Sequence, residues 1–280
     1  MHVSALYTYP IKSCAGLMHQ TVRFDKAGPS WDRRWVVTDS DGMFYTQREL
    51  PPMALIQPTF EGSTLKLAAP GMSAISIPLE KERPEPRLVR VWRDTCEAWD
   101  EGDQLAQWFS DYLKVDARLT RMTDTYYRAV NKDYAPYPAQ VGFADGYPAL
   151  IVSESSLDDL NQRLIERGSE AIPMKRFRPN IVITDSEPFA EDTWREVQIG
   201  AMTFDLVKAC ARCVMTTVDP ATGTIPDKAE PLATLNTFRK QERGVMFAQN
   251  AIHRAPGVLN VGDMVNVIEY QPQPLEFIIR

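Results

Sequence analysis

Two cysteines separated by two residues are the part of this sequence best suited to chemistry. They stand in Cys210-Ala211-Arg212-Cys213, and Lys208 lies two positions before the first of them. A cation beside a thiol favours the thiolate form, and a thiolate is a soft, charged donor that suits a transition metal. The segment therefore predicts an activated thiolate.

Three other roles are conceivable for this pair: a zinc site, a redox dithiol, or two structural cysteines. A zinc site needs four ligands, but Cys14 and Cys96 stand alone and far away, and the chain has only 3 histidines. A thioredoxin-like dithiol opens a helix, whereas we expect the strand before the pair to continue through the β-branched residues of 214–218. Two buried structural cysteines stay an alternative, because free cysteine is among the most buried residue types.

A second set of residues is basic or polar and stands at predicted strand ends or turns. Any single one is more often a solvated surface charge. Several at analogous positions in an acidic protein predict a pocket for a phosphorylated ligand, because the guanidinium fork matches phosphate oxygens. The sequence has no Gly-rich Walker or Rossmann loop for that task. The set consists of Lys12, Ser13, Arg33, Arg34, Arg48, Arg176 and Arg178.

Two further segments carry polar groups that could face a ligand. Residues 143–148 form a turn by their chemistry, and the backbone amides and the carboxylate of Asp145 are available there. Gln249 and Asn250 interrupt an apolar run. Buried amides need hydrogen-bond partners, so these two either pair with backbone or contact a polar ligand.

The composition is that of an ordinary globular protein: 44% hydrophobic and 24% charged residues. The net charge of −6 argues against nucleic acid or an acidic membrane as partner. No apolar run approaches the roughly 20 residues of a membrane span, and the first residues lack the features of a signal peptide. Four cysteines are too few for a disulfide scaffold. We therefore expect a cytoplasmic protein without a membrane or nucleic-acid partner.

The elements that must position these residues are mainly strands. The first 95 or so residues alternate short apolar runs with turns, which is typical of an all-β barrel or sandwich. Residues 34–38 and 43–46 flank Asp41-Gly42, a hairpin signal. Apolar residues at helical spacing predict a helix over 103–115. The other strands predicted in this part are 3–9, 21–24, 65–68, 74–77 and 88–92.

The second half mixes the two types after a long polar connection. Residues 123–140 show no period, and we place the domain boundary there. A helix capped by Ser153 or Ser155 is expected to run to Gly168. Further predictions are strands at 149–152, 180–184 and 264–269, a hairpin over 196–206 that leads into the cysteine segment, and a helix at 232–239. The predicted class is mostly β with some α, with domains at 1–122 and 123–270 and a tail at 271–280.

Taken together, these segments resemble the MOSC superfamily, in particular its branch of YcbX-like proteins and mitochondrial amidoxime-reducing components. A cysteine pair alone would be weak evidence, but the matching segments occur in the same order over nearly the whole chain. They are residues 9–14, 32–35, 143–148, 177–180, 210–223 and 247–250.

The resemblance implies an N-terminal MOSC β-barrel domain packed against a C-terminal MOSC β-barrel domain, with a molybdenum cofactor (Mo-molybdopterin) between them. It assigns the metal ligand to Cys213. At Ala211 relatives often carry Ser, so one side-chain hydroxyl is missing here. The cofactor contacts that it implies are Lys12, Ser13, Arg33, Arg178, Asn180, Ala211 and Arg212, together with Asp145, Gly146, Tyr147 and Asn250. We add Arg48 to the predicted cofactor-binding residues. Arg48 or Asp145 could also line the entrance through which the substrate passes.

The resemblance also implies a reductase of N-hydroxylated compounds (amidoximes, hydroxylamines and N-hydroxylated bases) that works by oxygen-atom transfer. The sequence has no cysteine after Cys213, and an iron–sulfur cluster needs four ligands. Electrons are therefore expected from a separate ferredoxin- or flavin-type reductase. Two alternatives stay open because a fold does not fix a function: a sulfur carrier with a persulfide on Cys213, and a module that binds or delivers the cofactor without turnover.

Overall fold

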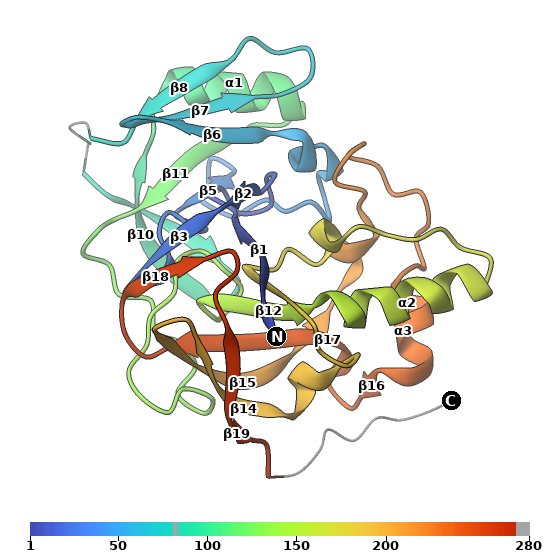
Figure 1. Cartoon of the computed structure of the whole chain (residues 1–280). Helices are drawn as coiled ribbons and strands as arrows, with labels where there is room; N and C mark the ends of the chain where they lie inside the picture. Colours follow the sequence, from blue (N-terminus) through green and yellow to red (C-terminus); the bar gives the residue numbers. More distant parts are fainter. Residues whose placement is uncertain (81–82, 84, 273–280) are drawn as a thin grey trace.

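The structure is a computed structural model that describes residues 1–80, 83 and 85–272. Most of its regular structure is β (Figure 1), as the sequence predicted. Its largest sheet consists of β1 (His2–Thr8), β2 (Leu17–His19), β12 (Ala149–Ser153), β13 (Ile181–Thr184), β14 (Trp194–Ile199), β15 (Met202–Arg212), β16 (Lys240–Gln241), β17 (Gly244–His253) and β19 (Val265–Tyr270). Eight of these strands follow the order β19-β14-β15-β17-β12-β13-β1-β2, and β16 pairs with β17.

Smaller sheets are built mainly from the first half of the chain. One has the order β5-β11-β10-β9, a second β18-β3-β4, and a third β6-β7-β8. Their strands are β3 (Thr21–Asp25), β4 (Gly28–Pro29), β5 (Trp35–Thr38), β6 (Gln57–Glu61), β7 (Thr64–Ala68), β8 (Ile75–Pro78), β9 (Arg87–Val91), β10 (Asp94–Asp100), β11 (Arg118–Met122) and β18 (Gly257–Asn260).

The α-helices agree with the sequence prediction within a few residues. They are α1 (Asp103–Leu113), α2 (Glu154–Glu166) and α3 (Leu232–Phe238). Ser153 caps α2, because its side chain accepts a hydrogen bond from the backbone N–H of Ser156. In Figure 1, α2 and α3 lie beside each other next to the large sheet, whereas α1 lies at the far side, where it contacts β11 and shares a hydrophobic cluster with residues of β7 and β8. None of the described helices combines the length and apolarity that a membrane crossing requires.

The described residues also include four short 3-10 helices: η1 (Pro51–Leu55), η2 (Met174–Arg176), η3 (Ala190–Thr193) and η4 (Val214–Thr217). The expectation that a strand continues through 214–218 is wrong, because η4 begins directly after Cys213. β-branched residues favour strands only where a neighbouring strand accepts them. Here the hydroxyls of Thr216 and Thr217 donate to the carbonyls of Cys213 and Val214, at 3.0 and 2.7 Å, which stabilises the tight turn instead.

Two other differences concern the first half. The predicted hairpin of 34–38 and 43–46 is reduced to a single bridge between Thr38 and Phe44. Strands β6, β10 and β11 were not predicted. In β10 the buried positions are the small residues Cys96 and Ala98 on either side of Glu97, so the alternation carries little hydrophobic signal. Of the predicted tail 271–280, residues 273–280 lie outside the described residues.

The large sheet brings distant segments to one place. β1 runs antiparallel to β13, with Leu6 opposite Ile181, and β12 runs parallel to β13, with Ile151 opposite the same residue. The segment that follows β1 and the segments that precede β12 and β13 therefore meet at one end of the sheet. Asn250 on β17 pairs with Leu150 at the start of β12 and with Lys208 on β15, which brings the cysteine segment close to them.

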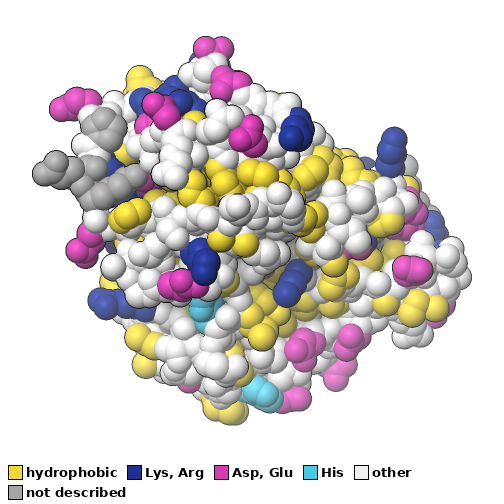
Figure 2. All heavy atoms as spheres, turned by 90° about the horizontal axis from the view of Figure 1, so that it is seen from above, with side chains coloured by type: hydrophobic (Ala, Val, Ile, Leu, Met, Phe, Trp, Pro, Cys, Tyr) yellow, Lys and Arg dark blue, Asp and Glu magenta, His cyan; other side chains and the backbone are white. Residues whose placement is uncertain are grey.

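The outer surface of the molecule carries positive and negative side chains in mixed positions. Figure 2 shows the face seen from above Figure 1, where Lys, Arg, Asp and Glu side chains are interspersed around a band of hydrophobic side chains. Mixed charge of this kind produces little net field. A cluster of cations without equal numbers of carboxylates would stand out against it.

Candidate functional site

A pocket with a cavity volume of about 290 Å³ lies where these segments meet. Residues from both halves of the chain line it. It brings together every residue predicted to hold the cofactor or the metal: Lys12, Ser13, Arg33, Arg48, Asp145, Gly146, Tyr147, Arg178, Asn180, Ala211, Arg212, Cys213 and Asn250. Three other predicted candidates do not line it, because Arg34 pairs with Asp124, Arg176 pairs with Asp219, and Gln249 donates to Asp192. Residues that share one cavity can act on one ligand, which scattered surface charges cannot.

The pocket has a deep end and a rim. At the deep end Lys12, Ser13 and Asn180 are only 6, 2 and 3% exposed. At the rim Trp92 is 43% exposed, and Asp145 and Cys213 are also exposed. The accessible thiol therefore stands at the open side, whereas the buried polar groups stand farther in.

Arg33 and Arg178 form the cationic deep end. The guanidinium carbons lie 4.3 and 4.2 Å from the centre of the Tyr9 ring, a distance at which cations are attracted to an aromatic ring. Arg178 donates from Nη1 to the backbone carbonyl of Cys14 at 2.6 Å, and Arg33 donates from Nη1 to the side-chain oxygen of Asn180 at 3.2 Å. Burial, with a further contribution from Arg33, lowers the pKa of Arg178 to about 10.

Three of the site residues have a left-handed backbone although none is glycine. The φ angles of Ser13, Arg33 and Arg178 are 66, 47 and 55°. Such a conformation costs an L-residue about 1–2 kcal/mol, and strain of this type concentrates at functional sites. The surrounding chain holds the strained residues in place: the backbone N–H of Arg33 donates to the carbonyl of Tyr9 at 2.7 Å.

Several polar atoms in the pocket lack a hydrogen-bond partner. They are Ser13 Oγ, Arg178 Nη2 and Arg212 Nε, which are buried and unpaired within the described part of the chain. Buried donors are nearly always satisfied in folded proteins, and each unsatisfied one costs about 1–3 kcal/mol. Orphaned donors in a cationic pocket fit a ligand that brings anionic oxygens, such as a phosphate.

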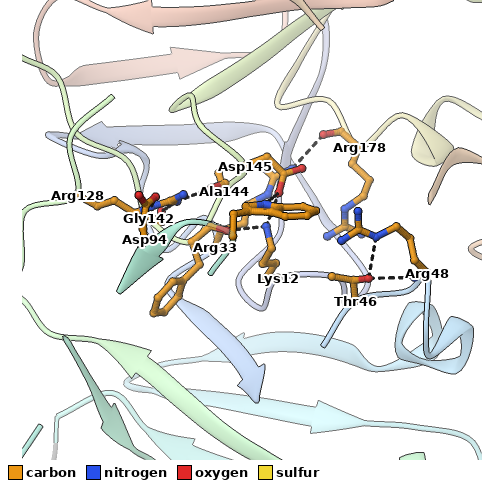
Figure 3. A network of polar contacts seen from close by, with 12 residues as sticks. Lys12, Arg33, Thr46, Arg48, Asp94, Arg128, Gly142, Ala144, Asp145 and Arg178 are labelled. Carbon is orange, nitrogen blue, oxygen red and sulfur yellow. Dashed lines mark hydrogen bonds and ion pairs between the residues drawn. The ribbon is translucent and has the colours of Figure 1, made fainter. Parts of the chain in front are cut away.

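Lys12 and Asp145 link the two ends of the pocket (Figure 3). Lys12 Nζ donates to Asp145 Oδ1 at 2.5 Å and to the Phe143 carbonyl at 2.9 Å, and Trp92 Nε1 donates to the same Oδ1 at 2.9 Å. Burial lowers the pKa of Lys12, and Asp145 only partly offsets this. Burial by the surrounding protein raises the pKa of the Asp145 carboxyl group. The ion pair with Lys12 and the hydrogen bond from Trp92 lower it by more, so its pKa lies below the usual range. Asp145 is therefore an anion at the rim.

Arg128 supports the turn that carries Asp145. In Figure 3 Arg128 lies on the side of the turn opposite Arg48 and Arg178. Its Nη1 donates to the carbonyls of Gly142 and Ala144 at 2.7 and 2.5 Å, and its Nε pairs with Asp94 at 2.7 Å. On its other side the turn packs closely on the backbone of Arg33. Position 142 needs glycine for this contact, because a Cβ there would lie 2.8 Å from the Arg33 carbonyl oxygen. The turn is thus fixed by contacts on both sides.

The cysteine pair lines the pocket as separate thiols. All four cysteines are free; Cys14 and Cys96 are buried, Cys210 is half-buried and Cys213 is exposed. Arg212 donates from Nη1 to Cys210 Sγ at 3.0 Å and from Nη2 to the Phe177 carbonyl at 2.8 Å. Among the described residues no three His, Cys, Asp or Glu side chains gather as metal ligands.

Sequence reasoning missed part of the lining. Thr46, Trp92, Phe177 and Lys208 also face the cavity. Lys208 was noted only as a neighbour of the cysteines. Trp92 had one available signal, since it ends the predicted strand 88–92, and strand ends supplied most of the other site residues. With Lys208, the lining carries six cations against the single carboxylate of Asp145.

The family models agree with this architecture. Residues 1–116 match the MOSC N-terminal beta barrel domain, and residues 138–266 match the MOSC domain. The chain therefore belongs to the MOSC family, which confirms both the predicted resemblance and the predicted fold class.

Curated relatives of this chain within the family are named amidoxime-reducing components. The chain is 39% identical to mitochondrial amidoxime reducing component 2 of Bos taurus, over 85% of this chain and 72% of that protein. It is 36% identical to mitochondrial amidoxime-reducing component 1 of Mus musculus and 34% identical to that of Homo sapiens, in each case over 95% of this chain and 82% of the relative.

Proposed function

We propose that this protein is a molybdenum-cofactor-dependent reductase of N-hydroxylated compounds. The observation that carries the proposal is the position of Cys213, an exposed thiol at the rim of a basic pocket with unpaired donors at its deep end. The names of the relatives, amidoxime-reducing components, support the same class of reaction. The substrates would be amidoximes, hydroxylamines and N-hydroxylated bases.

The deep end would hold the phosphate-bearing part of the cofactor. Arg33 and Arg178 offer guanidinium forks, and the unpaired Oγ of Ser13 offers a further donor. Hydrogen bonds from a cation to a phosphate oxygen are about twice as strong as neutral ones. Along the walls, the backbone at Ala211 and the amide of Asn250 would contact the pterin. Asn250 Nδ2 already donates to the Lys208 carbonyl at 3.2 Å, which leaves its oxygen available.

At the rim, Cys213 would ligate molybdenum through its thiolate. When bound, the cofactor supplies the two-electron reduction and accepts the oxygen of the N-hydroxylated group, and the protein orients and tunes it. Asp145 is the anion of the rim, and it would accept hydrogen bonds from the N–H and O–H groups of the substrate. Arg48, whose guanidinium stacks on Trp92 at 4.4 Å, would border the substrate on another side.

Electrons would come from a separate ferredoxin- or flavin-type reductase, because each turnover consumes two of them. We also propose a reducing, cytoplasmic location, which rests on the four free thiols. The relatives are named mitochondrial, so localisation of the tagged protein in its own cells is the test of this point.

The assignment of Cys213 is tested by two matched variants. In protein from a host that makes the cofactor, Cys213→Ser should abolish the reduction of benzamidoxime with an artificial electron donor, whereas Cys210→Ser should largely retain it. Equal losses in both variants would contradict the assignment. Molybdenum should be present at close to one atom per chain in the unaltered protein.

The exposure of Cys213 also suits the second candidate, a persulfide-based sulfur carrier. Mass spectrometry separates the two: a carrier holds one additional sulfur on Cys213 that a reductant removes, and it contains no molybdenum. Stoichiometric molybdenum without turnover, with every donor supplied, would instead indicate a cofactor-delivery module.

A further inference from the structure

Trp92 occupies a backbone conformation that large residues rarely adopt. It opens the two-residue turn that joins β9 to β10, and its φ of 58° is left-handed. Tight hairpin turns favour Gly, Asn or Asp at such positions, and a bulky residue there is a genuine outlier. Trp92 as a residue is 43% exposed, so burial in the core does not compensate for the strain. Outliers of this type collect at ligand clamps.

The indole is nevertheless held firmly. Its Nε1 donates to Asp145 Oδ1 at 2.9 Å, the Arg48 guanidinium lies 4.4 Å from a ring centre, and the Phe44 ring packs at 5.0 Å and 64°. These contacts leave part of the ring open, and that part borders the cavity. A fixed, partly exposed aromatic surface therefore stands on the same rim as Cys213.

We propose that Trp92 is a specificity-determining residue that stacks the conjugated ring of aromatic N-hydroxylated substrates. The inference rests on the proposed function and names the part of the substrate that the rim selects. Aromatic rings attract each other in offset or edge-to-face arrangements, and the fixed indole loses little freedom on binding. Asp145 Oδ2 receives no hydrogen bond from any described residue, so it accepts the N–H or O–H of the amidoxime group that the ring carries.

The two contacts make separate contributions to binding. The carboxylate recognises the N-hydroxylated group that every substrate of the class shares, whereas the indole recognises only the ring. An aromatic amidoxime should thus bind about tenfold more tightly than an aliphatic one, and the difference should depend on Trp92.

Binding of benzamidoxime and acetamidoxime, which differ in the ring alone, tests this directly. Calorimetry on the cofactor-loaded protein without an electron donor measures both affinities in the absence of turnover. The variants are Trp92→Ala, which removes the ring, and Trp92→Phe, which keeps a ring but removes the N–H. Tyr270→Ala is the control, since Tyr270 is a 60% exposed aromatic residue that does not line the cavity.

Trp92→Ala should reduce the tenfold preference for benzamidoxime to twofold or less, with a change below threefold for acetamidoxime. Trp92→Phe should keep most of the preference and weaken both ligands alike, because Asp145 loses one donor. The inference is overturned if the preference survives in Trp92→Ala, if both ligands weaken equally in that variant, or if the unaltered protein shows no preference. These results are independent of the proposed reduction of N-hydroxylated compounds. That proposal is tested by the turnover of the Cys213 and Cys210 variants.

Discussion

Arg33 donates a hydrogen bond from Nη2 to the backbone carbonyl of Arg178 at 3.2 Å, so the two cations are tethered side by side at the deep end of the pocket. Burial is the main cause of the lowered pKa of Arg178, and the like charge of Arg33 lowers it further. Arg33 already pairs with the buried carboxylate of Asp32 at 2.5 Å, whereas no salt bridge joins Arg178 to a described carboxylate. Burial of the Arg178 charge therefore costs folding free energy unless an anion is bound, and its orphaned Nη2 is where the anion would compensate that cost.

Arg178→Met should expose this conflict between stability and binding. Burying an ion costs several kcal/mol, and Met avoids this cost. The hydrogen bond to the Cys14 carbonyl is lost in exchange, and a hydrogen bond to a charged group contributes about 1.5–3 kcal/mol. We expect the cofactor-free variant to be at least as stable as the unaltered protein in urea unfolding. Its molybdenum content should nevertheless fall about tenfold or more, because a charge-assisted hydrogen bond is lost.

Two comparisons complete this experiment. Arg178→Lys keeps the charge without the fork and should show an intermediate molybdenum content. Arg195→Ala removes an arginine that pairs with Glu269 on the surface, and it should change neither quantity. Full molybdenum content in Arg178→Met would contradict the role of this residue.

The lowered pKa of Lys12 predicts a fall in activity on the alkaline side. Burial is the main cause of the lowering, so Lys12 loses its proton at a pH below the usual value of about 10.4. Its pair with Asp145 and its attraction for the cofactor are then lost. Rates of benzamidoxime reduction against pH should decline in that window, and Lys12→Arg should move the decline to higher pH.

Lys66→Arg is the matched control, since Lys66 is an exposed lysine paired with Glu61. It should leave the profile unchanged. Folding stability responds with the opposite sign: between the folded and unfolded pKa of Lys12 the unfolded chain binds more protons, so the contribution of Lys12 to stability rises with pH. A Lys12→Arg profile identical to that of the unaltered protein would argue against the titration of Lys12.

The sequence allowed the prediction of Lys12, Arg33 and Arg178 for a physical reason. Each stands next to a strand with a clear apolar pattern, and strand ends that meet in a sheet bring their neighbours together. Trp92 also stands at the end of a predicted strand, 88–92, but nothing in its residue type indicated a place in the site. Its position depends on a left-handed turn and on a contact with Asp145, 53 positions later in the chain.

The wrong strand at 214–218 shows a related limit. β-propensity reports how well a side chain suits a paired, half-buried surface, and pairing is a property of the whole sheet. Val214 is 52% exposed, so the surface that would reward a strand is missing there. A local hydrogen bond from Thr217 then decides the conformation.

Gly142→Ala should destabilise the protein although it adds a single methyl group. The new Cβ would lie 2.8 Å from the Arg33 carbonyl oxygen, which accepts a hydrogen bond from the Phe143 N–H at 2.6 Å. Overpacking of this kind costs about 1–3 kcal/mol. Urea unfolding measures the loss, and Gly146→Ala serves as control because nothing lies within 4 Å of the Cβ added there. Equal stability of the two variants would show that the turn moves freely.

Ser13 offers a test that separates strain from binding. Its φ of 66° favours glycine, and its hydroxyl is one of the unpaired donors. Ser13→Gly and Ser13→Ala both remove the hydroxyl, but only glycine relieves the left-handed strain. We expect both variants to lose molybdenum to a similar extent, and Ser13→Gly to be more stable than Ser13→Ala by about 1 kcal/mol in urea unfolding of the cofactor-free protein. If either variant retained full molybdenum, the hydroxyl would have no part in holding the cofactor.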